Sequence, residues 1–95
     1  MTTTETFLLV DDDKTFTRIL ARALSKRGHQ VLTASNSKEA KHLAERHPIT
    51  KALIDLKMEG ETGLQLIPDL KKLPAAPAIV MLTGYSSIAT TVEAI

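Results

Sequence analysis

Short apolar runs alternate with amphipathic segments along the whole chain, and this alternation constrains the fold more than any other feature. Strands are predicted at four of these runs, residues 6–10, 30–34, 51–56 and 78–82. The last run is apolar throughout, as expected for a parallel strand that is covered on both faces. A helical segment follows each run, so the predicted order is βαβαβαβα, which is typical of a parallel sheet with right-handed crossovers. The predicted fold class is therefore α/β, a doubly wound parallel sheet.

The first two predicted helices have recognisable ends. Apolar residues recur at helical spacing within residues 14–27, and Gly28 follows as a C-terminal cap. The residues with this spacing, which form an apolar stripe along the helix, are Phe16, Ile19, Leu20, Ala23 and Leu24. The second helix runs through Arg46 and begins with Asn36 and Glu39, a pair similar to a capping box.

The second half of the chain contains two further predicted helices. One covers about residues 64–73 and includes Pro68, whose cost is small near the first turns of a helix and larger deeper inside it. The other begins at Ser86 or Ser87, which would cap it, and continues to Ile95.

Composition excludes several classes of protein. The 95 residues suffice for one domain, and a hydrophobic content of 43% argues against disorder. Aromatic residues make up 3% and the net charge is +1, so we expect neither stacking platforms nor a strongly basic surface for nucleic acid. The chain has no cysteine, no signal-peptide core and no run long enough to span a bilayer. We therefore expect a cytoplasmic protein that does not enter a membrane.

Polar side chains follow three of the predicted strands at the point where each strand ends. Residues 11–13 are three consecutive aspartates after the first run, Asp55 lies near the end of the third, and Thr83 follows the fourth. The carboxyl ends of parallel strands meet at one edge of a sheet, where α/β proteins bind ligands. Adjacent carboxylates repel one another unless a cation lies between them, and Mg²⁺ prefers such oxygen ligands. The alternative is that the aspartates form a solvated turn that caps the next helix.

Three motifs resemble the receiver domain of bacterial two-component response regulators. Leu-Leu-Val-Asp-Asp-Asp is similar to the first strand and acidic pair of that family. Ala-Leu-Ile-Asp-Leu-Lys-Met is similar to its phosphoacceptor strand, and Val-Met-Leu-Thr-Gly to its fourth strand. The resemblance covers essentially all 95 residues and implies a flavodoxin-like fold with strand order 2-1-3-4-5. Residues 82–90 further resemble redox-responsive two-domain regulators with a Fis-type helix-turn-helix output domain.

The resemblance also implies roles for single residues. Asp55 would accept a phosphoryl group from a sensor histidine kinase or a phosphotransfer domain. Asp12 would bind Mg²⁺ directly, Asp11 mainly through water, and Lys57 through its backbone carbonyl. Thr83 would donate its hydroxyl to the phosphoryl group. A receiver is a phosphoacceptor that assists its own phosphorylation and dephosphorylation, so the chain is not expected to be an enzyme in the ordinary sense.

Two positions depart from the family pattern. Glu59 stands where the family often has proline. No lysine follows Lys72, so the lysine that the family carries after a fifth strand has no counterpart. The resemblance therefore implies a truncated receiver over residues 1–95 that lacks the fifth strand and helix, and whose DNA-binding output domain is missing. The fourth strand would then be an open edge, and we expect a homodimer through the surfaces that truncation exposes.

Two other functions fit parts of the sequence. Residues 11–15, Asp-Asp-Asp-Lys-Thr, also match the first motif of haloacid-dehalogenase-type phosphatases. In that alternative Asp11 would be the nucleophile and Asp13 the general acid, but Asp55 would have no role. In the receiver interpretation, we expect Asp13 to cap the following helix. A third possibility is an interaction fragment that keeps the fold and the metal site but has lost the switch.

Overall fold

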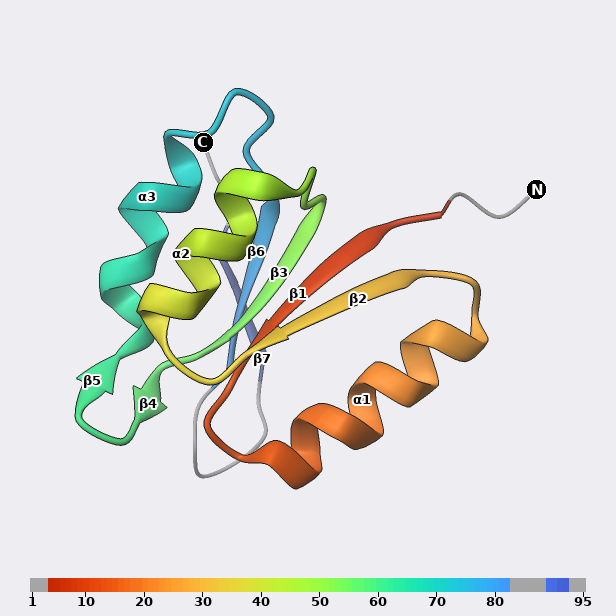
Figure 1. Cartoon of the computed structure of the whole chain (residues 1–95). Helices are drawn as coiled ribbons and strands as arrows, with labels where there is room; N and C mark the ends of the chain where they lie inside the picture. Colours follow the sequence, from red (N-terminus) through yellow and green to blue (C-terminus); the bar gives the residue numbers. More distant parts are fainter. Residues whose placement is uncertain (1–3, 83–88, 93–95) are drawn as a thin grey trace.

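The computed structural model describes residues 4–82 and 89–92 (Figure 1). In this part of the chain a five-stranded sheet has the order β2-β1-β3-β6-β7. Its strands are β1 (Thr6–Val10), β2 (Gln30–Ala34), β3 (Lys51–Asp55), β6 (Ala78–Leu82) and β7 (Ala89–Val92). The helices are α1 (Lys14–Lys26), α2 (Ser37–Arg46), the 3₁₀ helix η1 (Gly63–Leu66) and α3 (Ile67–Lys71). The first four strands pair in parallel, which confirms the predicted fold class.

Helices lie on both faces of the sheet. Figure 1 shows α2 and α3 together on one side and α1 on the other. Strand β1 lies between β2 and β3, so Leu8 is paired with Leu32 on one side and Ala52 on the other. The core fills the space between the sheet and the α2–α3 layer. Its fully buried members include Leu8, Val10, Ala40, Ile54, Leu70 and Ile79.

Helix α1 buries only part of its apolar stripe. Leu20 and Leu24 are half-buried, but Phe16 is 41% exposed, Ile19 is 64% exposed and Ala23 is exposed as well. Three of the five apolar residues in the stripe are therefore exposed. The reason is that α1 packs mainly over β2 and β1, so one side of its apolar stripe extends beyond the strands that it covers.

The expected fourth helix is also wrong where the structure describes that segment. Residues 89–92 form β7, which runs antiparallel to β6 and pairs Ala89 with Leu82 and Val92 with Ile79. Residues 90–92 are threonine, threonine and valine, whose β-branched side chains favour strands. An uncovered β6 would present a row of free backbone groups, and β7 pairs with that row. Strand β6 is therefore not an open edge in the described part of the chain.

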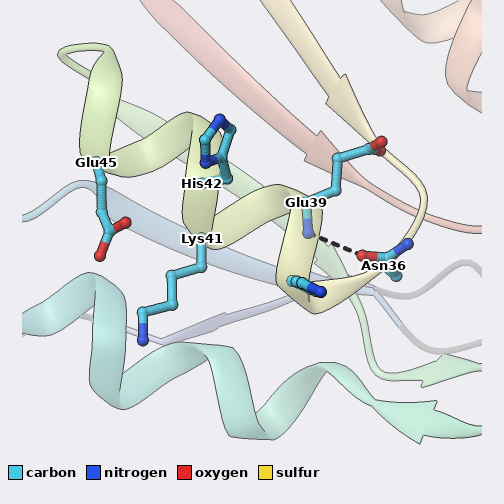
Figure 2. A pocket seen from close by; sticks show the side chains of 6 residues that line it. Asn36, Glu39, Lys41, His42 and Glu45 are labelled. Carbon is cyan, nitrogen blue, oxygen red and sulfur yellow. Dashed lines mark hydrogen bonds between the residues drawn. The ribbon is translucent and has the colours of Figure 1, made fainter.

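The helices on the other face follow the sequence more closely. The segment predicted as one helix at residues 64–73 begins as η1 and continues as α3, with Pro68 in the first turn of α3 where its cost is small. At the start of α2, the Asn36 side chain accepts a hydrogen bond from the Glu39 N–H at 2.8 Å (Figure 2). The Glu39 carboxylate accepts in return from the Ser35 N–H, one residue earlier than in a standard capping box. Among the described residues, no helix is long and apolar enough to cross a membrane.

Candidate metal centre

Three aspartates converge where β1 and β3 end. The two strands are neighbours, and Val10 is paired with Ile54, so the residues that follow both strands emerge side by side. Each of Asp11, Asp12 and Asp55 offers a carboxylate oxygen, and these oxygens lie within 4.8 Å of one another. The parallel topology thus brings together residues that are more than forty positions apart in the sequence.

The three carboxylates differ in their exposure to solvent. Asp55 is only 6% exposed, whereas Asp11 is half-buried and Asp12 is exposed. Asp55 accepts a hydrogen bond from the backbone N–H of Lys57 through Oδ1 at 3.1 Å. Gly63 packs directly against this strand end, because a Cβ atom there would collide with the carbonyl oxygen of Asp55 and the side chain of Ile54. Asp55, the predicted phosphoacceptor, is therefore held in a tightly packed position.

Burial and charge repulsion raise the pKa of Asp11. Partial burial raises the pKa of Asp11 from 3.8 to about 6, and the neighbouring charges of Asp55 and Asp12 act in the same direction. The backbone N–H of Asp13 donates to Asp11 Oδ1 at 2.9 Å and opposes the shift by stabilising the ionised form. A hydrogen bond between the Asp11 and Asp55 side chains also favours the protonated form of Asp11. A divalent cation bound between the carboxylates would relieve this repulsion.

The third consecutive aspartate caps helix α1. Asp13 Oδ1 accepts hydrogen bonds from the backbone N–H groups of Thr15 at 3.1 Å and Phe16 at 3.0 Å. This satisfies two amides that a helix otherwise leaves unpaired at its start. The capping role predicted for Asp13 is confirmed. The same engagement directs its carboxylate to the helix and away from the general-acid role that the phosphatase alternative required.

A short hairpin borders the cluster, and the sequence did not predict it. Strands β4 (Lys57–Met58) and β5 (Glu61–Thr62) pair antiparallel around a two-residue turn. The backbone N–H of Glu59 donates to Asp12 Oδ2 at 2.7 Å. On the other arm, Glu61 Oε1 accepts from the backbone N–H of Ser37, the first residue of α2, at 2.6 Å. The sequence signal for this turn is Gly60. Its φ is +79°, a value that glycine adopts more readily than other residues and that tight turns require.

Two predicted site residues need separate mention. Thr83 lies outside the described residues. Lys57, whose backbone carbonyl is a predicted ligand, is the residue that donates its N–H to Asp55.

A surface pocket drawn in Figure 2 is formed by residues of one segment only: Asn36, Lys38, Glu39, Lys41, His42 and Glu45. None of the clustered aspartates lines it, so the pocket is separate from the site.

The donor set fits a hard divalent cation. Carboxylate oxygens at mutual distances below 4.8 Å can share one ion, and Mg²⁺ commonly binds through a few carboxylates while keeping several waters. Exposure of Asp12 leaves room for those waters. The buried Asp55 lies within the same donor set.

Comparisons with known proteins agree on one family. A family profile described as a response regulator receiver domain matches residues 7–95. The photosynthetic apparatus regulatory protein RegA of Rhodovulum sulfidophilum is 43% identical over 88 residues, which cover 93% of this chain and 48% of that protein. The acid tolerance regulatory protein ActR of Rhizobium meliloti is 37% identical over 91 residues, covering 96% and 47%. The chain thus spans about half the length of these curated relatives.

Solved structures give the same result. A response regulator from Burkholderia pseudomallei, with a phosphorylated aspartic acid, a calcium ion and citrate, is 39% identical with a TM-score of 0.78. The match covers 88% of this chain and 49% of that one. The response regulator TrrA of Thermotoga maritima, in complex with Mg²⁺ and BeF, is 28% identical with a TM-score of 0.75, covering 86% and 71%. The haloacid-dehalogenase-type alternative finds no support in these matches. Sequence, fold and matches together show that this chain belongs to the response regulator receiver domain family.

Proposed function

We propose that Asp55 is the phosphoacceptor of this receiver domain and that a phosphohistidine on a sensor histidine kinase or phosphotransfer domain is the donor. The observation that carries the proposal is the position of Asp55, which is nearly buried and shares a 4.8 Å cluster with two more exposed carboxylates. The Burkholderia pseudomallei relative, described with a phosphorylated aspartic acid and a calcium ion, supports the same chemistry.

The neighbouring groups would hold Mg²⁺ as the cofactor. Asp12 and Asp55 are the proposed direct ligands, together with the backbone carbonyl of Lys57, and Asp11 would act mainly through water. Bound Mg²⁺ would neutralise negative charge on the carboxylates and on the oxygens of the incoming phosphoryl group. The TrrA structure, described as a complex with Mg²⁺ and BeF, supports this choice of ion.

The transfer itself requires little from the protein beyond position and charge. A carboxylate oxygen of Asp55 attacks phosphorus, the bond from phosphorus to the histidine nitrogen of the donor breaks, and an acyl phosphate on Asp55 results. The Lys57 N–H holds Asp55 Oδ1, which leaves the other oxygen to attack. Thr83 is proposed to donate its hydroxyl to the transferred group, which would convert a local charge change into a loop movement.

Phosphorylation by a small donor tests the proposal. The protein is incubated with Mg²⁺ and acetyl phosphate and its intact mass is measured. We expect one added phosphoryl group, absent in Asp55→Asn and absent when Mg²⁺ is removed by chelation. Asp13→Asn is the matched control, since it removes an adjacent charge while asparagine still caps α1. Modification that persists in Asp55→Asn, or that maps to Asp11, would overturn the assignment.

The biological role is proposed by analogy with the longer relatives. RegA and ActR are regulatory proteins about twice as long as this chain. We propose that phosphorylation here controls a transcriptional output domain and that DNA binding resides in that domain. A cytoplasmic location is part of the same proposal and agrees with the absence of cysteine.

Self-association is proposed through the exposed side of α1 and not through the edge of β6. Strand β7 pairs along β6, so edge pairing through β6 loses its basis. The apolar side of α1 remains uncovered, with Ile19 at 64% and Phe16 at 41% exposure. We propose that a second copy covers this side, and light scattering after size exclusion tests it. A dimer at concentrations on the order of tens of micromolar that Ile19→Lys dissociates is expected; a monomer for the unmodified chain contradicts it.

A further inference from the structure

The exposed member of the aspartate cluster has a backbone tether. Asp12 is exposed to solvent, and its charge is repelled by Asp11 and Asp55. A free aspartate in this position would rotate outward, away from the other carboxylates. The backbone N–H of Glu59 prevents this, because it donates to Asp12 Oδ2 at 2.7 Å across 47 positions of sequence.

The direction of this N–H is fixed by the hairpin that carries it. Lys57 is paired with Thr62 and Met58 with Glu61, so Glu59 and Gly60 form a two-residue turn. One end of the hairpin is attached to the sheet, since the Lys57 N–H donates to Asp55 and the Gly63 N–H donates to Leu56 at 3.2 Å.

The other arm of the hairpin is attached to helix α2. Glu61 Oε1 accepts the Ser37 N–H at 2.6 Å, and Glu61 Oε2 accepts from the Gln65 side chain at 3.1 Å. A carboxylate at the N-terminus of a helix forms a charge-assisted bond and interacts favourably with the helix dipole. The hairpin is thereby fastened at both arms, and the Glu59 amide is presented from a fixed support.

We propose that the backbone N–H of Glu59 is a positioning group that holds the Asp12 carboxylate ready for the divalent cation. This rests on the proposed function of the aspartate cluster as the Mg²⁺ site. Oδ2 is occupied by the amide, so the other oxygen of Asp12 is left for the ion. Proline, which receivers often carry at this position, has no N–H and cannot provide this bond. The tether is therefore a feature of this chain that receivers with proline lack.

The turn geometry supplies a clean test. Gly60 has a φ of +79°, the value that a type II turn requires at its third residue, and proline fits the second residue of such a turn. Glu59→Pro removes the N–H at a position where receivers often carry proline. Glu59→Gln is the matched control, because it removes the same side-chain charge and keeps the amide. Circular dichroism and thermal unfolding of both cation-free variants verify that they fold.

The affinity for Mg²⁺ is measured by isothermal titration calorimetry on both variants and on the unmodified protein. We expect Glu59→Pro to bind Mg²⁺ about tenfold more weakly than Glu59→Gln, as for the loss of a hydrogen bond to a charged group. If Glu59→Pro binds Mg²⁺ as tightly as Glu59→Gln, or more tightly, the positioning role of the Glu59 N–H is overturned while the proposed cation site still stands. An unmodified protein that binds no Mg²⁺ would overturn the cation site, and the positioning role with it.

A second pair of variants covers the case in which Glu59→Pro does not fold. Glu61→Ala frees the hairpin from α2, whereas Glu61→Gln removes the same charge and keeps an oxygen that accepts the Ser37 N–H. Glu61→Ala is expected to bind Mg²⁺ about threefold more weakly than Glu61→Gln, in line with one modest hydrogen bond. Equal affinities for this pair would contradict the claim that the fastened hairpin supports Asp12.

A measurement without metal tests the tether directly. Amide hydrogen exchange at Glu59 is compared between the cation-free protein and Asp12→Ala. We expect exchange to be at least about tenfold faster in Asp12→Ala, because its acceptor is gone. An unchanged rate would show that the bond does not exist in solution, and the proposal would fail whatever the Mg²⁺ affinity.

Discussion

Replacing Asp11 with asparagine is expected to stabilise the cation-free protein at neutral pH. Asp11 has a folded-state pKa of about 6 against an ordinary value of 3.8, mainly because it is partly buried beside Asp55 and Asp12. The folded state therefore holds the Asp11 proton more tightly than the unfolded state does. Stability consequently falls as the pH rises from 3.8 to about 6, and above that range the full penalty of an ionised Asp11 is present.

The size of this effect follows from the two pKa values. Fully expressed, their difference corresponds to about 3 kcal/mol. Asp11 is only half-buried, so solvent screens the charges, and we expect about 1 kcal/mol. For a domain of this size, that is an increase of about 4–8 °C in the melting temperature of Asp11→Asn. Asparagine still offers an oxygen to the Asp13 N–H, so the local turn is preserved.

Urea unfolding followed by circular dichroism provides the assay, at about pH 7.5 and about pH 4.5 and with and without Mg²⁺. The increase in the free energy of unfolding caused by Asp11→Asn should be present at the higher pH and should be smaller at the lower pH. Added Mg²⁺ should stabilise the unmodified protein more than the variant, because binding to the folded state adds to its stability. Asp13→Asn controls for a general change in net charge. A variant that is not stabilised at neutral pH, or whose gain is independent of pH, would refute the reasoning.

Three further predictions concern the same region. Asp13→Ala removes the cap of α1 and should cost about 1 kcal/mol in urea unfolding, whereas Asp13→Asn should not. Gly63→Ala places a Cβ against the Asp55 carbonyl and the Ile54 side chain, and should cost about 1–3 kcal/mol in the same assay; an unaffected variant would contradict the tight packing. The Mg²⁺ affinity from calorimetry should fall as the pH is lowered through about 6, since protonation of Asp11 competes with the ion; an affinity that stays constant there would exclude Asp11 from the site.

The sheet and the aspartate cluster could be predicted from the sequence because both depend on a strong, local signal. Buried parallel strands are continuous apolar runs, and the runs at residues 6–10, 30–34 and 78–82 have the bounds of the observed strands. Parallel topology then places Asp11 and Asp55 at one edge without any knowledge of side-chain packing.

The features that the sequence did not predict depend on tertiary contacts with neighbouring elements. Strands of two residues, such as β4 and β5, are too short to show a period, so the sequence does not predict the hairpin. The exposure of Ile19 depends on which strands α1 covers, which no helical period reveals. Residues 89–92 have a composition that suits a strand, yet they follow a plausible helix cap, and pairing with β6 decides between the two.

The hairpin also explains how three carboxylates remain together. Among the described residues, each carboxylate accepts a backbone N–H: Asp11 from Asp13 at 2.9 Å, Asp12 from Glu59 at 2.7 Å and Asp55 from Lys57 at 3.1 Å. Two of these three amides belong to the hairpin and its turn, so the same short element that flanks the site also offsets part of its charge. These N–H groups do not offset all of the negative charge, because the pKa of Asp11 is still raised to about 6. The remaining repulsion is what a divalent cation would relieve, and a cluster held this way gains more from the ion than one whose carboxylates are free to turn into solvent.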